Sequence, residues 1–204
     1  MEIALDFTHE QWQALNLKDT PEDAEKDAVE QGWQVAVDVL KDRLYSRYID
    51  PVDALLSAEA DKPAKERRFG FTILAIDLLL METIQAFKEG LEDTNGKSKA
   101  VFKRFLEQSP HFAEYFPTDD HRESFYKKFR CGILHQAEIQ SGALLWSIGE
   151  LYERADDMEV ANRTRIHEAL KADLDDYLAA LRNPDNVELR MLFKKKMDAV
   201  ANRA

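Results

Sequence analysis

Two residues of the segment FYKKFRCGILHQAE, residues 125–138, are suited to binding a phosphate and to moving protons at it. Arg130 and His135 are separated by four residues. A guanidinium can bind two oxygens of a phosphate at once, and a histidine near neutral pH can accept or donate a proton. Cleavage of RNA needs a base for the 2′-hydroxyl, an acid for the leaving oxygen and a cation beside the phosphorus. Such a pair could serve this chemistry without a metal ion.

A single chain carries only one Arg130 and one His135, whereas the reaction needs both an acid and a base. Two copies related by a two-fold axis would bring two arginines and two histidines into one cleft. Gly132 lies between the two residues and would allow two helices to approach closely. We therefore expect a homodimer with the site at its interface and RNA as a partner.

The arginine also needs an acidic partner. On an ideal α-helix, with about 100° between successive residues, Arg130 falls inside the apolar face and His135 on the polar face. A buried guanidinium without a partner costs several kcal/mol. Asp77 lies within the apolar stripe of an upstream helix, which predicts that it faces and orients Arg130, and Glu82 is the second candidate. The alternative is an ion pair that fixes helix register and does no chemistry.

The neighbours of Arg130 have two interpretations each. Tyr126 could stack on a base or pack in the core, and Lys127 and Lys128 could steer a phosphate backbone or keep the helix soluble. Cys131, if activated, would suit another kind of hydrolase, although a small packing residue is the better interpretation. We place Tyr126, Lys127, Lys128 and Glu82 among the substrate contacts.

The motif RCGILH, together with the upstream segment AIDLLLMETIQAF, resembles the HEPN superfamily of α-helical domains. Arg130 and His135 match the arginine and histidine of its Arg-x4-6-His motif, and the likeness covers about residues 64–140. The resemblance implies a helical bundle, a dimer and, in many members, a metal-independent ribonuclease that acts as a toxin, with an antitoxin partner, or in defence against phage. Cys131 stands where the family often has a polar residue. Ala137 stands where some toxins have a tyrosine that a partner enzyme modifies, so we do not expect that control.

Composition sets outer limits. The chain has 204 residues. Its single cysteine excludes an internal disulfide, and its net charge of −11 disfavours a protein that coats nucleic acid generally. No secretory signal is visible, and the longest apolar run, residues 71–81, is short for a membrane span and contains Asp77. We expect a cytoplasmic protein without a membrane partner. The chain has no phosphate-binding glycine loop or CxxC pair, and HFAEYF and DDHRE lack clear metal-ligand spacing, so we expect no cofactor and no metal.

The periodicity predicts an all-α, up-and-down helical bundle that forms one domain over residues 1–204. Helices are expected from a Thr20 cap at Pro21 to about residue 50, over 64–88, from a Thr118 or Asp119 cap to about 141, from Asn162 or Thr164 to 182, and over 185–200. The core bearing the motif is residues 64–140, and residues 162–204 are a helical extension. Residues 143–161 are expected to form a small β-hairpin rather than a short helix with a loop. The alternative function is a non-catalytic helical dimer module that binds a protein partner or a nucleotide.

Overall fold

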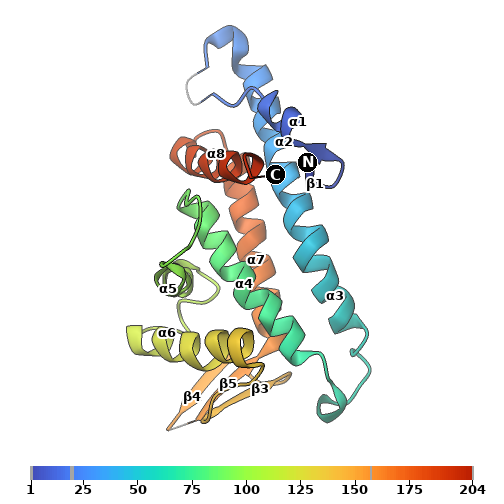
Figure 1. Ribbon diagram of the computed structural model, residues 1–204, viewed down its shortest axis with the longest axis vertical. Coiled ribbons are helices and arrows are strands. Elements are labelled where there is room, and N and C mark those ends of the chain that lie inside the picture. The colour runs from blue at the N-terminus through green and yellow to red at the C-terminus, as the bar shows by residue number, and fades with distance from the viewer. Residues whose placement is uncertain (1, 19–20, 157, 204) are drawn as a thin grey trace. The chain divides into compact units, whose positions relative to one another are not determined.

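The computed structural model describes residues 2–18, 21–156 and 158–203, and most of them are helical (Figure 1). The prediction of a largely α-helical protein with small strand elements is thus confirmed at this coarse level. The chain divides into two compact units. The first comprises Met1–Ile49, Ala86–Thr94 and Leu174–Ala204, and the second comprises Asp50–Gln85 and Asn95–Asp173.

The first unit begins with a short antiparallel pair, β1 (Glu2–Ala4) and β2 (Phe7–Thr8), followed by α1 (His9–Gln13). A 3₁₀ turn, η1 (Asp23–Glu25), precedes α2 (Lys26–Leu44), which passes into a π-helical turn, η2 (Tyr45–Ile49). The unit also contains the end of α7 (Arg163–Arg182) and all of α8 (Val187–Ala201). Helix α2 therefore starts later than the predicted Pro21, and the predicted cap Thr20 lies outside the described residues.

Four aromatic side chains form the core of the first unit around Phe193. The centroid of its ring lies 6.1 Å from Trp12, 6.4 Å from Trp33 and 6.3 Å from Phe87. All four rings are almost fully buried, and aromatic pairs at these distances add to the stability gained from burial alone.

The second unit contains most of the predicted motif-bearing core. Its helices are α3 (Asp50–Ser57), the 3₁₀ turn η3 (Ala64–Glu66), α4 (Gly70–Lys88), α5 (Ser98–Gln108) and α6 (Asp119–Phe125). The first half of α7 (Arg163–Arg182) also belongs to it, whereas residues 86–88 of α4 and 174–182 of α7 belong to the first unit. Thr118 caps α6 as predicted, because its side chain accepts a hydrogen bond from the His121 amide. The core is rich in phenylalanines: Phe102, Phe105, Phe112, Phe116, Phe125 and Phe129 are all fully buried.

Helix α4 is the most apolar helix of the chain. Its length and composition would also allow it to cross a membrane, but most of its residues are buried within the protein, as in the central helix of a soluble domain. The cytoplasmic location itself stays a prediction.

Residues 143–162 form strands, as expected, but in a different arrangement from a single hairpin. Three strands, β3 (Ala143–Trp146), β4 (Tyr152–Ala155) and β5 (Met158–Asn162), make a sheet in the order β3-β5-β4. Strands β4 and β5 form the antiparallel hairpin, and β3 pairs parallel to β5 on its other side. The sequence contains two apolar ends around a polar middle, and the prediction paired the two ends. The two ends do pair, as β3 and β5, but parallel rather than antiparallel, and the hairpin is formed by the polar β4 with β5, the most buried strand of the three.

The helix that carries the motif also differs from the prediction. A continuous α-helix was expected from residue 118 to about 141, but α6 ends at Phe125 and gives way to a π-helix, η4 (Tyr126–Gln136). The π-helix is followed by its C-cap residue Ala137, which has a left-handed backbone conformation with φ of 54°. Figure 1 shows α6 beside the three-stranded sheet.

Candidate functional site

The π-helix brings Arg130 and His135 together. The Nη1 atom of Arg130 lies 3.2 Å from Nε2 of His135. In a π-helix the backbone bond joins residues five apart, so residue i+5 lies about one turn beyond residue i. The prediction that the two side chains occupy different faces was wrong because it assumed α-helical geometry. The true helix type places both groups on one side.

Glu82 and Ser98 hold the guanidinium in place from the other side. Nη2 of Arg130 donates to Oε2 of Glu82 at 3.1 Å, and the Ser98 hydroxyl donates to the same oxygen at 2.6 Å. The side chains of Arg130 and Glu82 are only 15% and 11% exposed, so their attraction is weakly screened by water. The Tyr126 ring supports the guanidinium, with its centroid 5.5 Å from Cζ of Arg130. The arginine is therefore pre-positioned, whereas His135 is exposed to solvent.

Asp77 does not orient Arg130. Its Oδ1 lies 2.8 Å from Nδ1 of His167, which is itself 1% exposed, and Nε2 of His167 lies 3.3 Å from Oδ1 of Asp53. Asp77 and Glu82 are five residues apart on an α-helix, which separates their directions by about 140°. The predicted Asp77–Arg130 pair was therefore wrong, and the second candidate, Glu82, occupies that position.

His167 was not identified as the partner of Asp77 from the sequence. Asp77 lies in the middle of an apolar stripe, so a buried partner was required, and His167 shares a helix face with Leu170 and Leu174. A histidine on an apolar helix face was therefore the sequence feature that could have identified His167 as the buried partner of Asp77. Burial raises the pKa of Asp77 to about 6. Burial disfavours the charged form of His167, but the hydrogen bond and charge of Asp77, with the charge of Asp53, outweigh it and raise the pKa of His167.

The two lysines of the segment point to other partners. Nζ of Lys127 lies 3.1 Å from Oε1 of Glu123, and Nζ of Lys128 lies 3.1 Å from Oε1 of Glu159. Glu159 is on β5 and is 1% exposed, so Lys128 joins the motif helix to the sheet. The structure thus gathers Glu82, Tyr126 and Arg130 with His135, while Lys127 and Lys128 are engaged elsewhere.

Gly132 is explained by a contact within its own chain. A Cβ atom at this position would lie 2.6 Å from the carbonyl oxygen of Glu138, because the chain folds back along η4 after Ala137. The returning segment is fixed by a hydrogen bond from the Gln140 amide to the carbonyl of Lys128 at 3.3 Å. The glycine therefore lets residues 137–140 support the end of the helix that carries His135.

These contacts define what the cluster could do chemically. Since an arginine only donates, the hydrogen bond to Nε2 requires His135 to accept there, with its proton on Nδ1. An anion that approaches Arg130 would compete for the same Nη1 group and would meet the imidazole at hydrogen-bonding distance. Within the described part of the chain, no three His, Cys, Asp or Glu side chains gather as a metal site requires.

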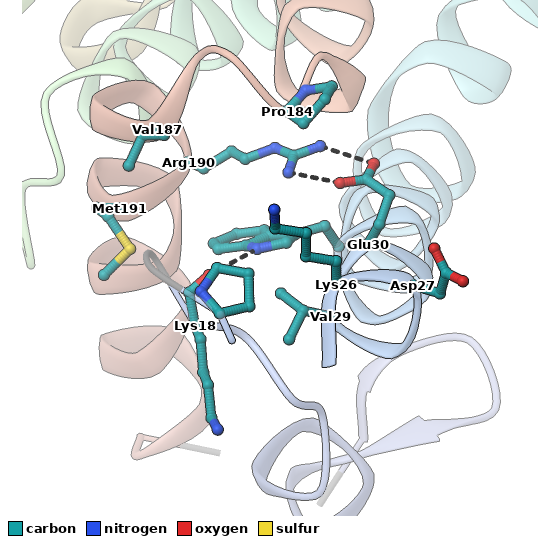
Figure 2. A pocket seen from close by; sticks show the side chains of 11 residues that line it. Lys18, Lys26, Asp27, Val29, Glu30, Pro184, Val187, Arg190 and Met191 are labelled. Carbon is teal, nitrogen blue, oxygen red and sulfur yellow. Dashed lines mark hydrogen bonds and ion pairs between the residues drawn. The ribbon is translucent and has the colours of Figure 1, made fainter. Parts of the chain in front are cut away.

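The first unit contains a cavity of about 310 Å³ between α2 and α8. Figure 2 shows Arg190 spanning it and facing Glu30, with Val187 and Met191 on the same helix. Arg190 donates to both oxygens of Glu30, at 2.8 and 2.9 Å, and stacks 5.3 Å from the centre of the Trp33 ring. The charge of Arg190 is matched by Glu30, and the surface of the cavity is mainly apolar, although Lys18, Lys26 and Asp27 also line it.

Comparison of the chain with protein-family models, with curated proteins and with solved structures finds no match in any of the three.

Proposed function

We propose that this chain is a HEPN-like, metal-independent endoribonuclease in which Arg130 binds the scissile phosphate and His135 transfers protons. The observation that carries the proposal is the 3.2 Å approach of Arg130 Nη1 to His135 Nε2 on an exposed helix end. Glu82 fixes the guanidinium from behind, which lowers the entropic cost of presenting it to a phosphate. An arginine whose only task was structural would not need an accessible histidine beside it.

The proposed reaction follows the acid–base route for RNA. A neutral imidazole takes the proton of the 2′-hydroxyl, the 2′-oxygen bonds to phosphorus, and the bond from phosphorus to the 5′-oxygen breaks. The leaving oxygen takes a proton from an imidazolium, which gives a 2′,3′-cyclic phosphate and a 5′-hydroxyl. Arg130 stabilises the charge that builds on the phosphate oxygens.

Two copies of the chain would separate the two proton-transfer roles. In a two-fold dimer, one His135 acts as the base and its counterpart as the acid, and each copy supplies one Arg130. The resemblance to the HEPN superfamily supports this dimer and an action as a toxin or in phage defence. Light scattering coupled to size-exclusion chromatography measures directly whether the chain forms a dimer in solution.

The test is cleavage of a mixed RNA pool in EDTA by the wild type, His135→Ala and Arg130→Ala. Arg47→Ala, a change at an exposed arginine of the first unit, is the matched control. We expect cyclic-phosphate ends from the wild type and the control, and a loss of at least ~100-fold in both site variants. Equal cleavage by the wild type and a folded His135→Ala variant would refute the proposal.

The alternative is a non-catalytic helical module that binds a protein partner or a nucleotide. One observation favours it: Arg130 already donates to Glu82 and contacts His135, so two of its three guanidinium nitrogens have partners within the chain. This alternative predicts that His135→Ala folds normally, that no RNA is cleaved under any condition, and that Arg130→Ala mainly lowers stability.

A further inference from the structure

The second unit has a cavity of about 350 Å³ whose lining is cationic and aromatic. It lies where the segment before α4 meets β3. Four basic side chains line it, Lys65, Arg67, Arg68 and Arg163, together with two exposed aromatic rings, Phe71 and Trp146. None of the described residues in the lining is acidic. This is unusual for a chain with a net charge of −11, because most of its surface repels anions.

The basic groups of this cavity are held mainly by neutral partners. Arg67 donates to the carbonyl oxygens of Lys62 at 3.0 Å and Ser147 at 3.4 Å, and Arg68 donates to the carbonyl of Lys65 at 3.2 Å. Carbonyl oxygens orient a guanidinium without cancelling its charge. The two arginines therefore remain available to a phosphate.

Arg163 also lines the cavity, and its guanidinium has a donor atom without a partner among the described residues. Its side chain is 3% exposed, and Nη2 donates to Oε2 of Glu59 at 2.6 Å. Its Nη1 atom is buried and has no hydrogen-bond partner among the described residues. A buried guanidinium donor without a partner costs free energy unless a ligand satisfies it. Glu59 also accepts from the amides of Arg68 and Phe69, so one carboxylate holds both Arg163 and the start of the segment that carries Arg68.

The two aromatic rings border the cavity and are open to solvent. Trp146 is 44% exposed and Phe71 is 42% exposed, although both are large apolar side chains. Residues of β3 alternate between half-buried and exposed, which turns Leu144 and Trp146 outward on one face. Exposed aromatic rings beside cations are the features on which unpaired bases stack while the phosphates are held.

We propose that this cavity binds one nucleotide of a single-stranded nucleic acid. The phosphate would be held by Arg67, Arg68 and Lys65 and the base would stack on Trp146 or Phe71. The volume, about 350 Å³, suits a small ligand of this size. This binding does not depend on cleavage at Arg130, and it would hold on a strand whether or not that strand is cut.

The test is fluorescence anisotropy with a labelled 12-nucleotide RNA strand, in EDTA, on a His135→Ala background that removes cleavage. We compare Trp146→Ala with Ile148→Ala, a change at an exposed apolar residue outside the cavity lining, and Lys65→Gln with Lys97→Gln, a change at an exposed lysine of the same unit. We expect Trp146→Ala to weaken binding about tenfold or more. Lys65→Gln should reduce the slope of log affinity against log salt by about one, and both controls should bind like the parent.

Parallel titrations with a nucleoside monophosphate, inorganic phosphate and duplex RNA show whether the cavity prefers a nucleotide within a single strand to these other phosphate-containing ligands. Tighter binding of the strand than of any of these supports the proposal, whereas binding of the free nucleotide alone overturns it. Equal losses of RNA affinity in Trp146→Ala and Ile148→Ala would overturn the proposal. So would a protein that binds no RNA and whose dimer dissociates in Trp146→Ala, because the exposed apolar side chains of β3 would then make a protein contact instead. RNA binding by a wild type that never cleaves leaves this inference intact and removes the ribonuclease proposal.

Discussion

Arg130 and Glu82 form an ion pair at 3.1 Å, and the carboxylate also accepts a hydrogen bond from Ser98. Loss of either partner should therefore affect the other differently. Removal of Arg130 takes a cationic partner from the nearly buried Glu82, while the hydrogen bond from the Ser98 hydroxyl remains. Removal of Glu82 leaves an arginine that can still turn toward His135. The pair therefore offers a way to separate the structural work of Arg130 from its chemistry.

Arg130→Ala should lower the free energy of unfolding by about 2–3 kcal/mol, because the Glu82 carboxylate loses a cationic hydrogen-bond donor in a poorly hydrated site. Glu82→Gln should cost less, since the amide still accepts from Ser98 and Arg130. Chemical denaturation of both single variants and of the double variant gives the coupling between them. A coupling near zero would show that the contact is not maintained in solution.

Gly132→Ala should destabilise the second unit by about 1–3 kcal/mol, because the new methyl group would overlap the carbonyl oxygen of Glu138. It should also lower RNA cleavage, since residues 137–140 support the end of the helix that carries His135. The matched control is Leu134→Ala, two residues further on and partly exposed, which should stay within about 0.5 kcal/mol. Equal stability of the two variants would contradict the close approach at Gly132.

Lys127→Ala and Lys128→Ala should differ strongly in stability. Lys127 pairs with Glu123 at a position where the lysine is 62% exposed, so its loss should cost less than about 1 kcal/mol. Lys128 pairs with Glu159, whose side chain is 1% exposed, so its loss should cost about 2–3 kcal/mol. Thermal unfolding of the two variants checks this difference. Equal stability with equal loss of RNA cleavage would restore both lysines to the substrate contacts.

Stability should fall as the pH rises through the titration range of Asp77 and His167. Burial raises the pKa of Asp77 from its usual 3.8 to about 6, so the folded state holds a proton that the unfolded state has lost. The pKa of His167 is also raised, which acts in the same direction above about pH 6.5. Folded protein binds more protons than unfolded protein in this range, and the free energy of unfolding should therefore be roughly 1–3 kcal/mol larger at pH 5 than at pH 8.

The variant Asp77→Asn should flatten this pH dependence, because it removes one titrating group and the charge that raises the pKa of His167. Asp61→Asn, a change at an exposed aspartate of the second unit, should leave the slope unchanged. Urea unfolding at four pH values between 5 and 8 makes the comparison. A wild-type slope of the opposite sign would show that the buried pair is not coupled to folding in this way.

The sequence was sufficient for the main helices and for part of the site. The helices predicted to end at residue 182 and to cover residues 185–200 are found as α7 and α8, because both segments have clear apolar periodicity. The need for an acid beside Arg130 also followed from burial alone. The choice between Asp77 and Glu82 did not, because both lie on one helix and only the neighbouring elements decide which side chain meets which partner.

Two features could not be predicted for physical reasons. A π-helix has no distinct composition, so the prediction for residues 125–138 assumed the ~100° rotation of an α-helix, which places Arg130 and His135 on different faces. The parallel pairing of β3 with β5 depends on a contact between strands whose local patterns are equally compatible with a simple hairpin. In both cases the deciding information is the backbone hydrogen-bonding partner, which side-chain periodicity does not specify.

The π-helical turn has a consequence for how this segment can change length. An α-helical turn makes neighbours of residues four apart, and a π-helical turn makes neighbours of residues five apart. Loss of one codon between Arg130 and His135, with a return to α-helical hydrogen bonding, would therefore keep the two side chains adjacent. Deletions of this kind usually move two side chains apart, whereas here we expect the sequence separation of Arg130 and His135 to shorten by one residue while the two side chains stay adjacent.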